Sequence, residues 1–101
     1  MIQNKMRPIH PGEILREEYL LPLGMSANAL SIALRVPAPR INEVVHERRG
    51  ITSDTALRLA RYFNTTPQFW LNLQASFDLK QTAIQVGDKI EREIHPMQVA
   101  A

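Results

Sequence analysis

Apolar residues recur at helical spacing along most of the chain, and no stretch gives a convincing strand pattern. Pro11 and Gly12 open a first predicted helix, which Pro22 and Gly24 close. Ser26 is a suitable N-cap for a second helix, ANALSIAL, whose apolar stripe consists of Ala29, Leu30, Ala33 and Leu34. The first third of the chain therefore predicts two short amphipathic helices.

The third predicted helix has two prolines at its start. Pro37 and Pro39 suit a helix entrance, because N–H groups in the first turn have no intrahelical partner and the fixed φ of proline fits a helix start. Gly50 is expected to supply a left-handed exit after the helix ends near residues 46–49. The residues that this helix should bury are Ile41, Val44 and Val45.

Two further helices and a weaker one complete the pattern. A fourth helix should begin at the N-cap Thr52, end at Asn64 and bury Ala56, Leu57, Ala60 and Phe63. A fifth should begin at Thr66 and Pro67, with an apolar stripe of Phe69, Trp70, Leu73 and Phe77. A weaker sixth helix around Gly87 should end before Pro96. These elements predict an all-α bundle of five or six helices, with a core over residues 9–78 and a C-terminal tail helix over 79–95.

Length and composition limit the classes of protein. A chain of 101 residues fits a single domain, 1–101, and the absence of cysteine excludes disulfides and thiolate zinc sites. The start has no signal-peptide core, and no apolar run approaches the ~20 residues that span a bilayer, so we expect a cytoplasmic protein without a membrane partner. The three histidines are scattered and no residue set is spaced for catalysis, which predicts no enzyme, no metal site and no cofactor.

The positive charge of the chain is concentrated in its middle. The net charge is only +2, yet residues 35–61 contain six arginines against three acidic residues, which gives that segment +3. One interpretation is a solvated arginine face. The other follows from the layout: two helices of about eight residues joined by a short turn, with arginines on and after the second, are typical of a helix-turn-helix that enters the DNA major groove. An ordinary helical hairpin in a core is the alternative.

Two runs of sequence resemble a known family. HPGEILREEYLLPLGMS and RINEVVHERRGITSDTALRLARYFNTTPQFWLNLQ are similar to Xre-type helix-turn-helix regulators and, more narrowly, to HigA or VapI antitoxins, over roughly residues 9–80. The resemblance implies a lambda-repressor-like domain that dimerises, binds a palindromic operator in double-stranded DNA, represses its own operon and binds a ribonuclease toxin. A stand-alone Xre-type repressor without a toxin is the main alternative, and a bundle that binds only proteins is another.

The resemblance also places the motif on this sequence. Residues 26–34 match its first helix and residues 37–46 its recognition helix. Ser31 stands where the family usually has a small Ala, and is still small enough for close packing. Arg35 stands where a turn Gly is usual, and a positive φ at a non-glycine residue costs on the order of 1 kcal/mol. We therefore expect the turn to differ slightly from that of the family, with an effect on the crossing angle of the two helices rather than on the motif.

By the same resemblance, the start of the recognition helix faces DNA. Ala38 and Pro39 could contact a thymine methyl group, Asn42 could pair with adenine, and Glu43 could accept from cytosine, while Arg40 could read guanine or hold a phosphate. Phosphate contacts are expected from Arg48, Arg49 and the first-turn amides after Thr52.

The fifth predicted helix is the expected dimer interface. It carries half of the six aromatic residues of the chain, and a small four-helix core cannot obviously cover them all. We expect a homodimer that uses Phe69, Trp70, Leu73 and Phe77, together with part of the tail from Leu79 to Ile94. The alternative is that Trp70 and Phe77 complete the core of one chain.

Overall fold

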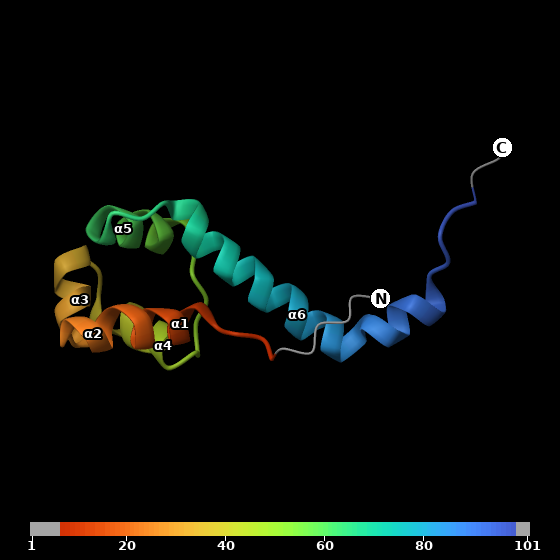
Figure 1. Cartoon of the computed structure of the whole chain (residues 1–101), viewed down its shortest axis with the longest axis horizontal. Coiled ribbons are helices and arrows are strands. Elements are labelled where there is room, and N and C mark those ends of the chain that lie inside the picture. Colours follow the sequence, from red (N-terminus) through yellow and green to blue (C-terminus); the bar gives the residue numbers. More distant parts are fainter. Residues whose placement is uncertain (1–6, 99–101) are drawn as a thin grey trace.

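The structure, a computed structural model, describes residues 7–98; the ends of the predicted domain, 1–6 and 99–101, lie outside the described residues. All regular structure in the described part is helical, as predicted (Figure 1). In chain order the elements are α1 (Pro11–Ile14), the π-helix η1 (Leu15–Leu20), α2 (Leu21–Leu23), α3 (Ala27–Leu34), α4 (Ala38–Val45), α5 (Ser53–Phe63) and α6 (Pro67–Glu93).

The first predicted helix is confirmed as one continuous run with a wide turn inside it. The N–H of Leu21 donates to the carbonyl of Arg16, five residues earlier, so the π turn joins α1 to α2 without a break. This turn precedes Pro22, whose ring would clash with the carbonyl four residues before it in a regular helix. Gly24 then ends the run in the left-handed conformation, with φ of 60°.

The helix-turn-helix elements begin as the sequence predicted, and the turn between them keeps the left-handed residue of the family. The Ser26 side chain caps α3 by accepting from the N–H of Ala29 at 3.0 Å. Arg35 adopts the left-handed conformation, with φ of 60°, where the family usually has glycine. Pro37 is the N-cap of α4, so both prolines lie at the helix entrance. Because Arg35 reproduces the turn, α3 and α4 pack directly on each other.

The predicted left-handed exit at Gly50 is wrong. The helix α4 ends at Val45, and the residue with positive φ after it is Glu47, at 61°. Gly50 lies in a close approach instead: a Cβ atom there would lie 2.8 Å from Oε1 of Gln74 in α6. That same oxygen accepts the N–H of Ile51 at 2.6 Å, so the loop after α4 is tied to α6.

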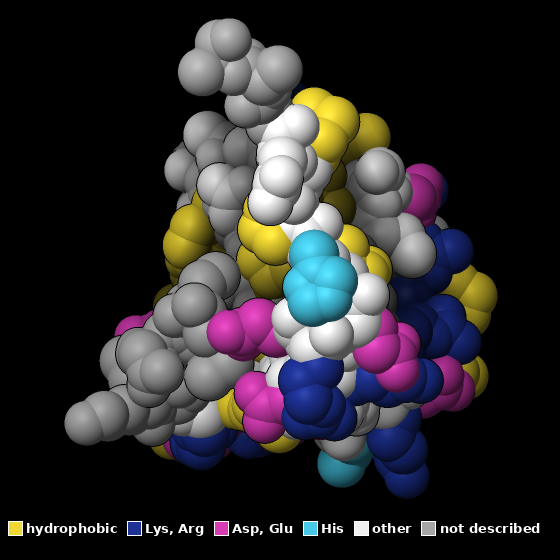
Figure 2. Space-filling view, turned by 90° about the vertical axis from the view of Figure 1, so that its right-hand side faces the viewer, with side chains coloured by type: hydrophobic (Ala, Val, Ile, Leu, Met, Phe, Trp, Pro, Cys, Tyr) yellow, Lys and Arg dark blue, Asp and Glu magenta, His cyan; other side chains and the backbone are white. Residues whose placement is uncertain are grey.

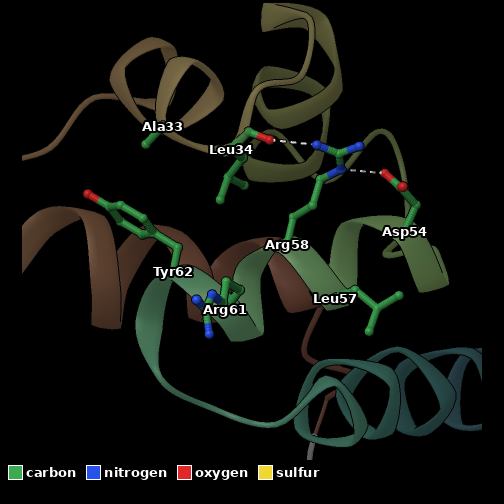
Figure 3. Close-up of a pocket in the computed structure, with 7 residues that line it drawn as sticks. All are labelled: Ala33, Leu34, Asp54, Leu57, Arg58, Arg61 and Tyr62. Carbon is green, nitrogen blue, oxygen red and sulfur yellow. Dashed lines mark hydrogen bonds and ion pairs between the residues drawn. The ribbon is translucent and has the colours of Figure 1, made fainter.

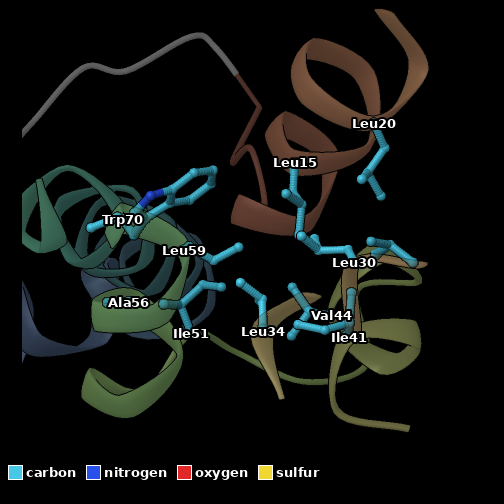
Figure 4. Close-up of a cluster of buried hydrophobic side chains, with 12 residues drawn as sticks. Leu15, Leu20, Leu30, Leu34, Ile41, Val44, Ile51, Ala56, Leu59 and Trp70 are labelled. Carbon is cyan, nitrogen blue, oxygen red and sulfur yellow. The ribbon is translucent and has the colours of Figure 1, made fainter. Parts of the chain in front are cut away.

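The core lies between the first helical run, the helix-turn-helix, α5 and the start of α6 (Figure 4). Its buried apolar residues are Leu15, Leu20, Leu30, Leu34, Ile41, Val44, Val45, Ile51, Ala56, Leu59, Ala60 and Trp70. The three predicted core residues of α4 are therefore confirmed.

Some predicted core positions are wrong. Leu57 is 60% exposed, and Leu59 is buried in its place, because α5 packs against both α3 and α6 and its buried side is centred between Ala56 and Ala60. Ala29 and Ala33 also lie at the surface. The α3 stripe consists instead of Leu30, Ser31 and Leu34, and the hydroxyl of buried Ser31 donates to the carbonyl of Ala27 at 3.0 Å.

The fifth and sixth predicted helices are one helix, so a separate tail helix over 79–95 is wrong. Gly87 lies inside α6, because a single glycine costs a helix only about 1 kcal/mol, a small cost in a helix of 27 residues. The helix ends at Glu93, before Pro96, as predicted. Its second half changes direction and extends away from the body formed by the earlier helices (Figure 1), which gives the molecule extents of 58 × 24 × 22 Å.

Candidate nucleic-acid interface

Three helix starts meet at one side of the helix-turn-helix. Asn42 of α4 donates to Oδ1 of Asn28, in the first turn of α3, at 2.9 Å. Arg40 of α4 donates to Oδ2 of Asp54, in the first turn of α5. The first turns of α3, α4 and α5 therefore share one surface, and their unpaired N–H groups and helix dipoles favour an anionic ligand there.

The structure places the residues predicted to read bases on this surface. Ala38 and Pro39 are exposed in the first turn of α4, and Arg40 is half-buried beside them. Both Nδ2 hydrogens of Asn42 have partners, since the amide also donates to the carbonyl of Ala38 at 2.9 Å. Its orientation is therefore fixed before any base is bound.

The remaining predicted contacts divide into paired and unpaired groups. Glu43 and Arg49 form an ion pair with 2.9 Å between Oε1 and Nη2, so each neutralises the other. Arg48 is exposed and makes no ion pair within residues 7–98. Thr52 is the N-cap of α5, and its hydroxyl accepts from the N–H of Thr55 at 3.4 Å, which leaves the first-turn amides of Ser53 and Asp54 pointing outward.

Sequence reasoning missed three residues of this surface: Asn28, Asp54 and Arg58. Asn28 was detectable as the second residue after the Ser26 cap, in the first turn of a helix that accompanies the recognition helix. Asp54 and Arg58 are four residues apart on α5, a spacing that predicts an ion pair. The contact between Asp54 and Arg40 spans two helices and has no local sequence signal.

The Asp54 carboxylate is held ionised by its neighbours. Hydrogen bonds from Arg58 and, next, from Arg40 lower the pKa of Asp54 below its usual value. Basic and acidic side chains are mixed in the same way on the face drawn in Figure 2, where Lys and Arg side chains lie on the right and along the lower part, with Asp and Glu side chains among them.

A shallow hollow adjoins the interface. Its volume is about 400 Å³, and it lies between α3 and α5 (Figure 3). The lining side chains are Ala33, Leu34, Asp54, Leu57, Arg58, Arg61 and Tyr62. Within it, Arg58 joins the carboxylate of Asp54 to the carbonyl of Leu34, so the hollow and the interface share one hydrogen-bonded group.

The four residues predicted for the dimer interface differ in exposure. Trp70 is 0% exposed and its indole N–H donates to Thr65 Oγ1 at 2.8 Å, so it lies in the core of a single chain, as the alternative interpretation had it. Phe77 is half-buried, with its ring 4.9 Å from that of His10. Leu73 packs partly on the core, and Phe69 is the most exposed of the four.

Two other features, a metal site and a membrane span, each set a requirement for the described residues. Within 7–98, no three His, Cys, Asp or Glu side chains come together in a way that could hold a metal ion. None of the helices in the same part is both long and apolar enough to cross a membrane.

Comparison with known proteins identifies the family. No protein-family model matches the chain. It is 64% identical over 78 residues to virulence-associated protein I (VapI) of Dichelobacter nodosus, a match that covers 77% of this chain and 72% of that protein. The chain belongs to the HigA/VapI family of helix-turn-helix proteins. It is also 43% identical over 79 residues to YbaQ of Escherichia coli K12, an uncharacterised HTH-type transcriptional regulator, over 78% of this chain and 70% of YbaQ.

A solved structure of a HigA protein has the same fold. The structure of the Pseudomonas aeruginosa antitoxin HigA with the higBA promoter aligns with a TM-score of 0.89 and 51% identity, over 91% of this chain and 100% of that one. This similarity confirms for our HigA/VapI chain the all-α, helix-turn-helix fold that the sequence predicted.

Proposed function

We propose that the chain is a sequence-specific DNA-binding antitoxin, which represses its own operon as a homodimer and neutralises a ribonuclease toxin. One observation carries the proposal: the first turns of α3, α4 and α5 converge beside the basic segment, in a chain that is 51% identical to a HigA antitoxin whose structure includes its promoter. The proposed function requires binding only, with no catalytic step and no cofactor.

The proposed DNA contacts follow from the placement of the side chains. Exposed Ala38 and Pro39 supply apolar contact with base edges, Arg40 supplies hydrogen-bond donors, and Asn42 supplies its Oδ1 acceptor, because its Nδ2 hydrogens already have partners. Arg48, with no ion pair in the described residues, is positioned for a phosphate. The amides that follow Thr52 add backbone donors at the start of α5. Glu43 and Arg49 contribute less to affinity, because each already binds the other.

A footprint on DNA upstream of the chain's own gene tests this part of the proposal. We expect protection of a palindromic site, because one recognition helix reads only a few base pairs and two half-sites about one DNA turn apart are needed. Binding should weaken steeply with salt. Equal binding to the upstream DNA and to a scrambled duplex would contradict a role as a specific repressor.

The homodimer is proposed to form through α6. Its exposed second half carries Leu79, Ala83, Val86 and Ile90, at successive spacings of four, three and four residues, which places them along one side of the helix. The side chains of Leu79 and Ile90 are 66% and 48% exposed. In a single chain this apolar stripe is therefore exposed to solvent. Of the four residues that the sequence predicted for the interface, Phe69 is the most exposed and Trp70 is buried. Phe69 is therefore the one of the four that we propose extends this contact.

The proposed toxin partner rests on the relationship to antitoxin HigA. The similarity to YbaQ favours the second candidate, a stand-alone repressor. Co-expression with the product of the adjacent reading frame separates the two. An antitoxin should co-purify with that product and relieve the growth arrest that it causes, whereas a stand-alone repressor should bind DNA and do neither.

A further inference from the structure

Asp54 is an acidic residue within the surface that we propose meets DNA. The two other acidic side chains of residues 35–61 are used elsewhere: Glu43 pairs with Arg49, and Glu47 with Arg16 of the first helical run. Of these three acidic residues, only Asp54 bonds to the recognition helix from a neighbouring helix. A carboxylate on a DNA-binding surface opposes binding through repulsion from the negatively charged DNA backbone, so its effect on specificity must be considered separately from its effect on affinity.

The Asp54 carboxylate is itself held in a fixed position. Its Oδ2 atom accepts from Nε of Arg58 at 2.9 Å, and Nη1 of Arg58 donates to the carbonyl of Leu34 at 2.8 Å. Figure 3 shows this chain of contacts from α5 to the end of α3. Asp54 also belongs to the first turn of α5, so both its backbone and its side chain are restrained.

Arg40, by contrast, depends on Asp54 for its position. The guanidinium of Arg40 donates to the same Oδ2 atom, and this is its only ion pair within residues 7–98. A free arginine side chain has many rotamers and can reach any nearby phosphate, a contact that carries no sequence information. Bidentate recognition of guanine requires the planar guanidinium at a set angle.

We propose that Asp54 is a positioning residue for sequence recognition: its carboxylate holds the Arg40 guanidinium in one orientation, suited to a base edge, and excludes the many rotamers that would reach a phosphate instead. The inference rests on the proposed DNA-binding function. In this arrangement Asp54 reduces affinity for every DNA sequence through its charge, and increases the difference in affinity between the operator and other DNA.

The test compares Asp54→Asn with Asp88→Asn in the full-length chain. Asp88 is an exposed residue of α6 with no ion pair in the described residues, so its substitution makes the same change in net charge far from the interface. The wild-type chain first selects its preferred duplex from randomised DNA. Each variant is then titrated against that duplex and a scrambled one at several salt concentrations.

We expect Asp54→Asn to bind the scrambled duplex about three- to tenfold more tightly and the selected duplex no more tightly than wild type, so the specificity ratio falls about tenfold. The salt slope on scrambled DNA should steepen by about 0.9, the equivalent of one added phosphate contact. Asp88→Asn should keep the wild-type ratio. In an Arg40→Ala background, Asp54→Asn should leave the ratio unchanged, because the residue that it positions is gone.

Several results would overturn the inference. An equal gain of affinity for both duplexes would make Asp54 a source of repulsion only, and a wild-type ratio in Asp54→Asn would remove any role in specificity. A fall of the ratio that persists in the Arg40→Ala background would exclude action through Arg40. Wild-type protein that selects no sequence would overturn the proposed function as well. Thermal denaturation checks each variant, and Asp54→Ser replaces Asp54→Asn if the latter does not fold.

Discussion

Arg40 and Arg48 have different surroundings, which predicts different consequences for DNA binding. Arg40→Ala should weaken binding to the operator by about 1–3 kcal/mol and have less effect on scrambled DNA, because it removes a base-reading group. Arg48→Ala should weaken binding to all sequences similarly and reduce the salt slope by about 0.9. Gel-shift titrations measure both quantities, and wild-type affinity in both variants would exclude these residues from the interface.

His10 makes the stability of the fold depend on pH. Its Nδ1 accepts the N–H of Gly12 at 2.9 Å as the N-cap of α1, which requires a neutral ring. Burial lowers the pKa of His10 below its ordinary value of 6.5. The negative charges of Glu47 and Asp78 partly offset this shift, and the positive charge of Arg16 adds to it. At His10 the folded state therefore binds fewer protons than the unfolded state. The contribution of His10 to the free energy of unfolding is complete above pH 6.5 and is lost as the pH falls below that value.

Thermal denaturation at pH 7.5 and at pH 5.5 should show this effect, with a lower Tm at the acidic pH for the wild-type chain. His10→Asn keeps a capping acceptor but cannot titrate, so its Tm should fall less between the two conditions. His95→Asn, at an exposed position, should behave as wild type. An identical fall in all three proteins would assign the pH dependence to other groups.

Gly12 and Gly50 both lie close to other groups, but their neighbours differ in rigidity. A Cβ atom at Gly12 would lie 1.8 Å from the backbone carbonyl oxygen of Val44, whereas one at Gly50 would meet the end of the Gln74 side chain at 2.8 Å. Gly12→Ala should therefore destabilise the fold by about 3 kcal/mol or more, and Gly50→Ala by about 1 kcal/mol. Urea unfolding measures both; a larger loss for Gly50→Ala would contradict this order.

At the scale of the helix, α6 continues through Gly87 at a local cost. The nearest atom to a Cβ at this position is Ala83 Cβ at 3.8 Å, an ordinary contact, and the backbone is helical. Gly87→Ala should therefore stabilise the second half of α6 by about 1 kcal/mol. Far-UV circular dichroism and amide exchange over the second half of α6 should show more helix and slower exchange.

Gly24→Ala is the matched control for that substitution. Gly24 also has open space around it, with no atom within 4 Å of a Cβ, but its φ is +60°. Alanine at this position should lower the free energy of unfolding by about 1 kcal/mol, because a left-handed backbone disfavours any residue with a Cβ. Faster amide exchange in Gly87→Ala than in the wild-type chain would contradict the prediction, and would indicate that α6 packs in a way that requires glycine at this position.

At the scale of the whole molecule, the projecting half of α6 predicts how two chains associate. Ile90→Asp places a charge in the stripe that begins at Leu79 and should convert the dimer to a monomer of 11.5 kDa. Ile84→Asp is the control, since Ile84 is 70% exposed but lies on a different side of α6 from the stripe. Sedimentation at micromolar concentration distinguishes them. A dimer that survives Ile90→Asp would place the interface elsewhere.

Local signals in the sequence determined most of the helices and their ends. Capping side chains at Ser26, Thr52 and Thr66, together with Asn64 in the left-handed conformation, set helix boundaries through contacts within a few residues. Because such contacts are short in sequence, they can be predicted from residue types alone. The same holds for the helix-turn-helix, whose proline entrance, second helix and following arginines are continuous in the chain.

Tertiary structure decided what depends on residues far apart in the sequence. The residue with positive φ after α4 is Glu47, whereas Gly50 lies against Gln74 of α6, and packing on two neighbouring helices buries Leu59 rather than Leu57. The contact between Arg40 and Asp54 joins two helices across an intervening loop. Each of these outcomes is set by the relative positions of packed helices, which local periodicity does not specify.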